Sequence, residues 1–239
     1  VTAGATNDGK VWEAATGEIH ERLSKHDTWI RTVEYAPTGE LVTCDSEGFV
    51  HAWPRHRRPQ NVLLGHSSYV YALDVSPDGE RIVSGGWDGA AGGQGGLRLW
   101  DAASGATIGS VGASYEIVTA AAFDAHGSSL LVAIQKGKAG ESGIAVLDPT
   151  TLERRLWFQG HGDLQPQRVV AFPNGRRVLS IDMRANAIVW DAGSGEVHGR
   201  LDGVPHQSSS PIGLGIDVRG DGAVLATVLA EKSIRLYDS

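Results

Sequence analysis

The chain has 239 residues, of which 41% are hydrophobic and 21% are charged, and its formal net charge is −7. This acidic balance disfavours a general nucleic-acid binder, and no apolar run approaches the roughly 18–20 residues that span a bilayer. The single cysteine, Cys44, excludes an intrachain disulfide framework and a cysteine-based zinc cage. One cysteine is compatible with a reducing compartment, and we expect a cytoplasmic location.

Six segments along the chain alternate in polarity and then reach an aromatic residue or leucine, followed by an acidic or turn residue. These positions are Trp12, Trp53, Trp100, Leu147, Trp190 and Tyr237. Their spacings are 41, 47, 47, 43 and 47 residues. A period of about 40–45 residues is typical of a radially repeated sheet rather than of a single-site enzyme core. The chain is therefore predicted to be a repeat protein, whose function must be sought where the repeats differ.

The third repeat shows the expected unit most clearly. Alternation predicts strands over residues 70–75, 81–84, 97–101 and 106–111. The Ser-Pro-Asp-Gly sequence at 76–79 predicts a reversal, because proline fixes one φ angle and Asp-Gly favours a turn. Four short strands joined by tight turns predict a twisted antiparallel sheet. Such a sheet cannot bury both of its faces alone, so neighbouring units must stack.

Four short motifs of this repeat resemble the WD-repeat β-propeller family. They are Gly-His at 65–66, Ser-Pro-Asp-Gly at 76–79, Ser-Gly-Gly-Trp-Asp-Gly at 84–89 and Trp-Asp at 100–101. The resemblance implies an all-β fold, a β-propeller of four-stranded antiparallel blades. Six blades are visible within a single domain over residues 1–239, the first and last incomplete. Their expected bounds are 1–26, 27–66, 67–112, 113–161, 162–203 and 204–239.

The first and last residues fall inside expected blades. The chain begins in the second strand of the first blade and ends just after the third strand of the sixth. We therefore expect the N-terminal part of the ring to lie outside this chain, and a complete ring to have six or seven blades. Near-consensus copies of this kind resemble those of multidomain signalling or defence proteins, in which a propeller regulates an attached effector domain.

The resemblance also implies a buried hydrogen-bond network that locks each blade through a histidine, a hydroxyl, an acid and a tryptophan. The residues in these positions are His66, Ser84, Asp88 and Trp100 in the third blade, His26, Thr43 and Trp53 in the second, and His161, Ser180 and Trp190 in the fifth. The acid position holds Glu47 in the second blade and Arg184 in the fifth. A structural role is favoured over a catalytic triad for these side chains.

A candidate partner surface lies on the face that carries the second-to-third turns of each blade, here called the top face. Aromatic residues precede the inner strands or the turn acid at Trp29, Tyr69, Trp87 and Tyr115. Two neighbouring blades also carry enlarged top loops, over residues 90–96 and 136–143. Tryptophan and tyrosine are enriched at interface hot spots. The alternatives are that these aromatics only cover the blade below and that the loops are tolerated insertions.

A basic turn on the opposite face provides another candidate. Arg55, Arg57 and Arg58 lie between Pro54 and Pro59. Such a cluster favours the binding of phosphate or of an acidic partner. Electrostatic docking through this turn is an alternative function, although a solvated turn fits the acidic chain better.

Sequence patterns that would indicate catalysis are absent. The chain contains no P-loop, no Gly-x-Ser-x-Gly elbow and no His-Glu-x-x-His motif. We therefore expect a non-catalytic interaction scaffold or sensor module, without a cofactor or metal. Its expected partner is a protein or an attached effector domain of the same polypeptide. The alternative from another class is a propeller enzyme or small-ligand binder that uses the central channel.

Overall fold

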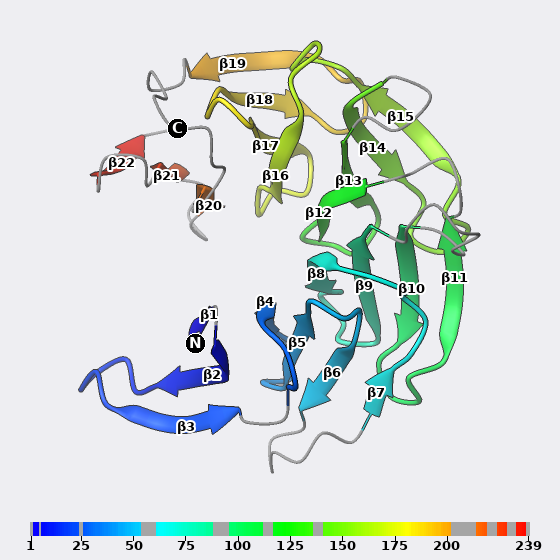
Figure 1. The fold of residues 1–239 in the computed structure, drawn as a ribbon. Coiled ribbons are helices and arrows are strands. Elements are labelled where there is room, and N and C mark those ends of the chain that lie inside the picture. Colours follow the sequence, from blue (N-terminus) through cyan, green and yellow to red (C-terminus); the bar gives the residue numbers. More distant parts are fainter. Residues whose placement is uncertain are drawn as a thin grey trace. The chain divides into compact units, whose positions relative to one another are not determined.

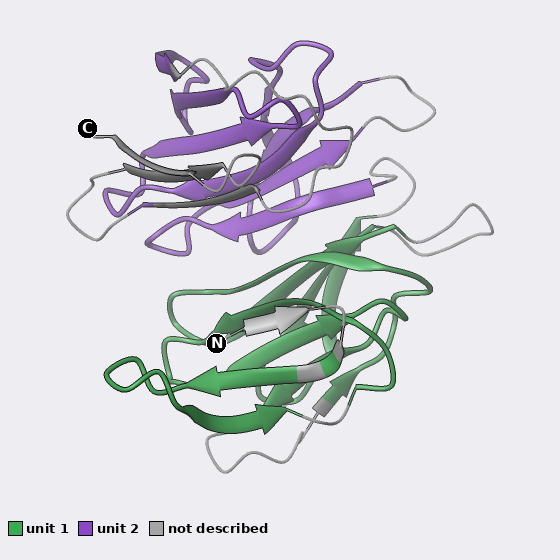
Figure 2. Cartoon of the chain, turned by 60° about the vertical axis from the view of Figure 1, so that its left-hand side comes forward, with its two compact units in different colours: residues 1–114 green, residues 115–239 purple. Residues whose placement is uncertain are grey.

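The computed structural model describes residues 2–4, 6–23, 26–53, 61–87, 96–111, 117–135, 141–201, 214–218, 224–228 and 233–237. These residues form 22 β-strands and no helix. The chain divides into two compact units, residues 1–114 and 115–239, which are coloured separately in Figure 2. Each unit is described by itself below.

The first unit contains three antiparallel sheets whose strands follow one another in chain order (Figure 1). The three-stranded sheet consists of β1 (Thr2–Gly4), β2 (Thr6–Trp12) and β3 (Ile19–Leu23). The second sheet consists of β4 (Ile30–Tyr35), β5 (Leu41–Asp45), β6 (Val50–Trp53) and β7 (Asn61–Leu63). The third consists of β8 (Val70–Val75), β9 (Arg81–Gly86), β10 (Leu97–Asp101) and β11 (Thr107–Val111).

The second unit repeats this organisation. Its first sheet consists of β12 (Ile117–Phe123), β13 (Leu130–Gln135), β14 (Gly143–Leu147) and β15 (Arg154–Phe158). The next consists of β16 (Pro166–Ala171), β17 (Arg177–Asp182), β18 (Ala187–Asp191) and β19 (Val197–Leu201). The last described sheet has three strands, β20 (Leu214–Val218), β21 (Val224–Val228) and β22 (Ser233–Tyr237). The predicted all-β fold of four-stranded antiparallel blades is confirmed.

Consecutive sheets within a unit bury apolar side chains against each other. In the first unit, Val42 and Leu63 of one sheet share a buried cluster with Leu73, Ile82 and Trp100 of the next. An equivalent cluster in the second unit consists of Ala120, Leu131, Ala133, Ile144, Val146, Phe158, Val169, Val178, Ile188 and Trp190. Because both faces of the middle strands are covered, β14 is buried along its whole length instead of alternating.

An aspartate at the end of the third strand orders the turn into the fourth strand of its sheet. Asp191 accepts backbone N–H hydrogen bonds from Gly193 at 3.0 Å and from Ser194 at 2.9 Å. Arg176 donates its Nε–H to the other carboxylate oxygen at 2.6 Å. The Ser194 amide contributes most to lowering the pKa of Asp191 to about 2, burial opposes it, and Arg176, the Ser194 hydroxyl and the Gly193 amide lower it further.

This turn predicts a pH dependence of stability. A carboxyl whose pKa is lower in the folded than in the unfolded chain stabilises the fold above its unfolded pKa, and that stabilisation is lost as pH falls through the folded value. For Asp191 this window runs from 3.8 down to about 2. Urea denaturation should therefore show a smaller loss of stability across this window for Asp191→Asn than for the native chain. Glu196→Gln, in the same turn, is the control and should follow the native chain; an equal pH slope in all three would contradict the prediction.

Candidate functional site

Three exposed aromatic side chains gather at the edge where β4 and β8 begin and β5 and β9 end, the edge expected to carry the top face. Trp29 directly precedes β4, Tyr69 directly precedes β8, and Trp87 directly follows β9. Their exposed fractions are 52%, 36% and 43%. Exposed apolar surface that is gathered in one place can mark an interaction site, so this group is the candidate interaction surface.

These rings are linked by a guanidinium group. The Cζ atom of Arg31 lies 5.8 Å from the ring centroid of Trp29 and 5.3 Å from that of Tyr69. Tyr69 in turn stacks on Trp87, with centroids 6.5 Å apart and ring planes 6° from parallel. Trp29, Arg31, Tyr69 and Trp87 therefore form one continuous row, here called the aromatic surface. Cation–π pairs at exposed sites contribute about 0.5–1 kcal/mol each, which favours this arrangement of the guanidinium between the two rings.

The backbone beneath the aromatic surface is tied across neighbouring strands. Ser46 donates its N–H to the carbonyl of Trp29 at 3.1 Å, and Trp87 donates its N–H to the carbonyl of Tyr69 at 2.9 Å. The Nε–H of Arg31 donates to Ser46 Oγ at 2.8 Å. The end of β9 approaches Tyr69 so closely that a β-carbon on Gly86 would overlap the Tyr69 carbonyl oxygen. These hydrogen bonds and this close approach fix the backbone that carries the rings at the strand ends.

The structure places three of the four predicted partner residues in this row, and Tyr115 lies outside the described residues. The two enlarged loops lie outside them as well, apart from Gly96 and residues 141–143. The basic turn, with Arg55, Arg57 and Arg58, is also outside the described part of the chain. Sequence reasoning missed Arg31. The pairing of β4 with β5 is irregular between Ile30 and Thr32, so simple strand alternation did not give the direction of the Arg31 side chain.

The expected blade networks involve histidine, hydroxyl and tryptophan side chains that lie within hydrogen-bond distance. In the fifth expected blade, His161 Nε2 lies 2.8 Å from Ser180 Oγ, which accepts a hydrogen bond from Trp190 Nε1–H at 3.1 Å. In the second, His26 Nε2 lies 2.7 Å from Thr43 Oγ1, to which Trp53 donates at 2.8 Å. In the third, His66 and Trp100 each lie 2.8 Å from Ser84 Oγ, and Asp88 is outside the described residues.

The acid of two networks differs from the sequence expectation. In the second blade, Asp45 Oδ2 lies 3.0 Å from His26 Nδ1, so the acid is Asp45 and not Glu47. In the fifth, Asp182 Oδ2 lies 3.2 Å from His161 Nδ1, so the acid is Asp182 and not the residue at position 184. Each aspartate follows the hydroxyl residue by two positions and shares its face of the strand. Burial opposes ionisation of Asp182, but hydrogen bonds from His161, Asn186 and backbone amides outweigh it and lower the pKa.

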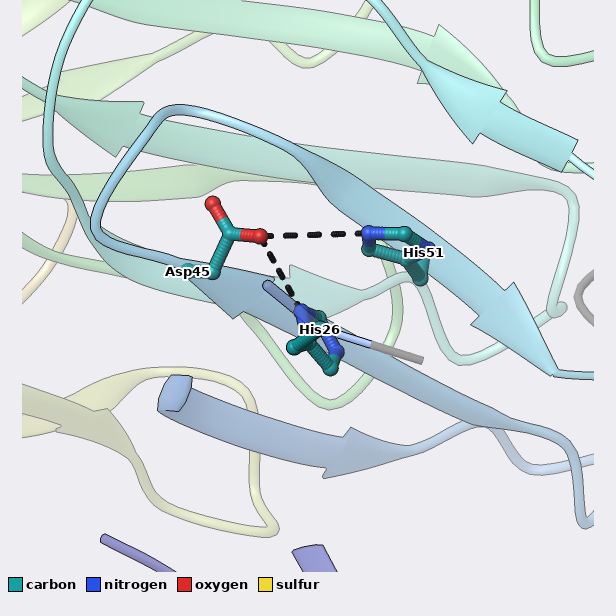
Figure 3. A group of neighbouring side chains, drawn as sticks. All are labelled: His26, Asp45 and His51. Atoms are coloured by element: carbon teal, nitrogen blue, oxygen red, sulfur yellow. Dashed lines mark hydrogen bonds and ion pairs between the residues drawn. The ribbon is translucent and has the colours of Figure 1, made fainter. Parts of the chain in front are cut away.

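The second sheet adds a further histidine to its network. His26, Asp45 and His51 are all buried, and their side chains converge as Figure 3 shows. His51 Nε2 lies 3.9 Å from Asp45 Oδ2, and the rings of His26 and His51 have centroids 4.2 Å apart. Burial, with a contribution from His26, lowers the pKa of His51 to about 4. The imidazole of His51 is therefore neutral at pH 7.

A pocket of about 310 Å³ lies between the second and third sheets of the first unit, away from the aromatic surface. Small apolar side chains such as Ala36, Ala52 and Ala103 line much of it, and Glu40 is the one charged residue among its described lining residues. Acid–base chemistry needs at least two placed polar groups near a substrate.

The four-stranded sheets and these networks are of the kind that the resemblance to WD repeats predicted. A family model described as "WD40: WD domain, G-beta repeat" matches residues 57–101, which include strands β7 to β10. The chain thus contains a WD repeat, as its sequence resemblance predicted. WD40 repeats generally mediate protein interactions and scaffolding and are generally non-catalytic. Within the described part of the chain, there is no helix of the length and apolarity that would cross a membrane.

Proposed function

We propose that this chain is a non-catalytic protein-interaction module and that the aromatic surface binds its partner. The observation that carries the proposal is the row of three partly exposed rings joined by Arg31, held at the ends of β4, β8 and β9. Tryptophan, tyrosine and arginine are the residue types most enriched among binding hot spots. In WD40 domains, which typically bind protein partners, such a row offers anchors already in place.

The chemistry of the row indicates what it would bind. The rings offer apolar faces, while the guanidinium of Arg31 has only its Nε–H engaged by a described residue, Ser46. Its remaining N–H groups can donate to a carboxylate or a backbone carbonyl, in a forked geometry that lysine lacks. The favoured partner is therefore a protein segment that presents an apolar side chain beside an acidic one. A separate protein and another domain of the same polypeptide both satisfy this description.

Alanine substitution tests this proposal. Trp29→Ala, Tyr69→Ala and Trp87→Ala should each weaken partner binding by about thirtyfold or more, since truncated hot-spot residues cost about 2 kcal/mol or more. Arg31→Lys should weaken binding too, because lysine keeps the charge but neither stacks nor donates in a fork. Binding is measured by quantitative affinity purification from the native source, followed by titration of the partners recovered.

The control is Ile108→Ala, which removes an exposed apolar side chain from the outer strand β11 of the same unit. It should leave the recovered partners and their affinities unchanged. Equal losses with Ile108→Ala and with Tyr69→Ala would show a nonspecific effect. Unchanged binding in all aromatic variants would overturn the proposal.

A further inference from the structure

We propose that His26, Asp45 and His51 form a site for a divalent first-row transition-metal ion, with Zn²⁺ as the representative cation. The three potential ligand atoms are His26 Nδ1, Asp45 Oδ2 and His51 Nε2, and all lie within 4.8 Å of one another (Figure 3). A tetrahedral zinc ion with bonds of about 2.0–2.1 Å separates its ligand atoms by about 3.3 Å. Small side-chain rotations would therefore bring the three atoms to coordination distance.

The surrounding hydrogen bonds orient two of these ligands. Asp45 Oδ1 accepts N–H hydrogen bonds from Glu47 and Phe49, each at 3.0 Å, which leaves Oδ2 directed at the two histidines. His26 Nε2 lies 2.7 Å from Thr43 Oγ1, so Nε2–H can donate to that oxygen while Nδ1 binds the metal. A ligating histidine usually donates its other ring N–H to a fixed acceptor in this way.

His51 is the residue that a structural lock does not account for. Its Nδ1 atom is buried with no hydrogen-bond partner among the described residues, and its Nε2 lies 3.9 Å from the carboxylate, beyond hydrogen-bond distance. Burying a polar side chain without hydrogen bonds is unfavourable. A metal bond at Nε2 would give this ring nitrogen a strong interaction, which the carboxylate at 3.9 Å does not provide.

The fifth expected blade provides a natural comparison without the third ligand. His51 is the cross-strand partner of Thr43, and the residue in the same relation to Ser180 is Ile188. There the Oδ2 of Asp182 accepts a second hydrogen bond, from Asn186 Nδ2 at 2.8 Å. The position corresponding to Asn186 is Phe49, which offers no side-chain donor. Where the fifth blade has an isoleucine, and an asparagine hydrogen-bonded to the acid, the second sheet therefore has a second imidazole close to its carboxylate.

The test is calorimetric titration of the chelator-treated full chain with Zn²⁺, for the native sequence and for His51→Ile. The native chain should bind one zinc ion per chain at this site. The His51→Ile variant should bind zinc with an affinity lower by about tenfold or more. Isoleucine is the matched replacement because Ile188 occupies the corresponding position and is almost fully buried. Zinc should also raise the thermal midpoint of the native chain and leave that of the variant unchanged.

A second variant keeps the test decisive if isoleucine perturbs the fold. His51→Gln retains a polar side chain of similar length and should also lose zinc binding, while circular dichroism without zinc matches the native spectrum. Equal zinc binding by the native chain and by a folded variant would assign the metal to surface histidines and overturn the proposal. No binding by the native chain would overturn it as well.

Discussion

Replacing Trp190 with alanine should lower the free energy of unfolding by about 4 kcal/mol, the middle of the range for truncating a buried aromatic side chain. Trp190 is fully buried. Its ring stacks on Phe158 with centroids 4.1 Å apart and planes 6° from parallel, and its Nε1–H donates to Ser180. The substitution removes apolar contact between two sheets and leaves the Ser180 hydroxyl with one partner fewer. Urea denaturation followed by far-UV circular dichroism measures the loss.

Two further variants separate the causes of that loss. Trp190→Phe keeps a ring against Phe158 but removes the donor to Ser180, so it should cost less than the alanine variant. Met183→Ala truncates an exposed side chain of the same unit and should change stability by no more than about 0.5 kcal/mol. A loss in Trp190→Ala no larger than in Met183→Ala would contradict the assignment of Trp190 to the core between the sheets.

Replacing Gly86 with alanine should be the most disruptive change at the aromatic surface. The added β-carbon would overlap the backbone carbonyl oxygen of Tyr69, and a backbone atom cannot move aside as a flexible side chain can. The start of β8 must shift, which strains the hydrogen bond from Trp87 N–H to Tyr69. We expect a loss of about 3 kcal/mol, at the upper end for overpacked sites, together with weaker partner binding.

The matched control for this substitution is Gly199→Ala in strand β19, where an added β-carbon meets nothing within 4 Å. Both variants are compared by urea denaturation and by titration with the partner. Gly199→Ala should leave partner binding unchanged and alter stability only slightly. Similar behaviour of the two variants would show that the close approach of β9 to Tyr69 is not needed for either property.

Much of the fold could be predicted from the sequence because local signals agree with each other. Alternation and turn chemistry predicted strands at 70–75 and 97–101, and β8 and β10 have those bounds. The expected strand at 81–84 continues to Gly86, since its last two residues also pair with β8. Strand ends depend on cross-strand pairing, which a single sequence does not show.

The candidate site was less predictable because it depends on contacts between segments. The sequence motif predicted the network acids at positions 47 and 184, which lie in exposed turns. The acids are Asp45 and Asp182, which lie at the buried ends of the preceding strands. The approach of His51 to Asp45 follows from the pairing of His51 with Thr43, which only the register reveals. Arg31 belongs to the aromatic surface because the starts of β4 and β8 are neighbours, and the sequence does not show that these two strands lie side by side.

Site-specific photo-crosslinking tests the central claim, that the aromatic surface contacts a protein partner, most directly. A photoreactive phenylalanine analogue replaces Trp87 in one chain and Val197, an exposed strand residue of the other unit, in a second. Irradiation in the native source should give a discrete protein adduct at position 87 that disappears when Tyr69→Ala is added, and no such adduct at position 197. The same adducts at both positions, or none at position 87, would contradict the claim.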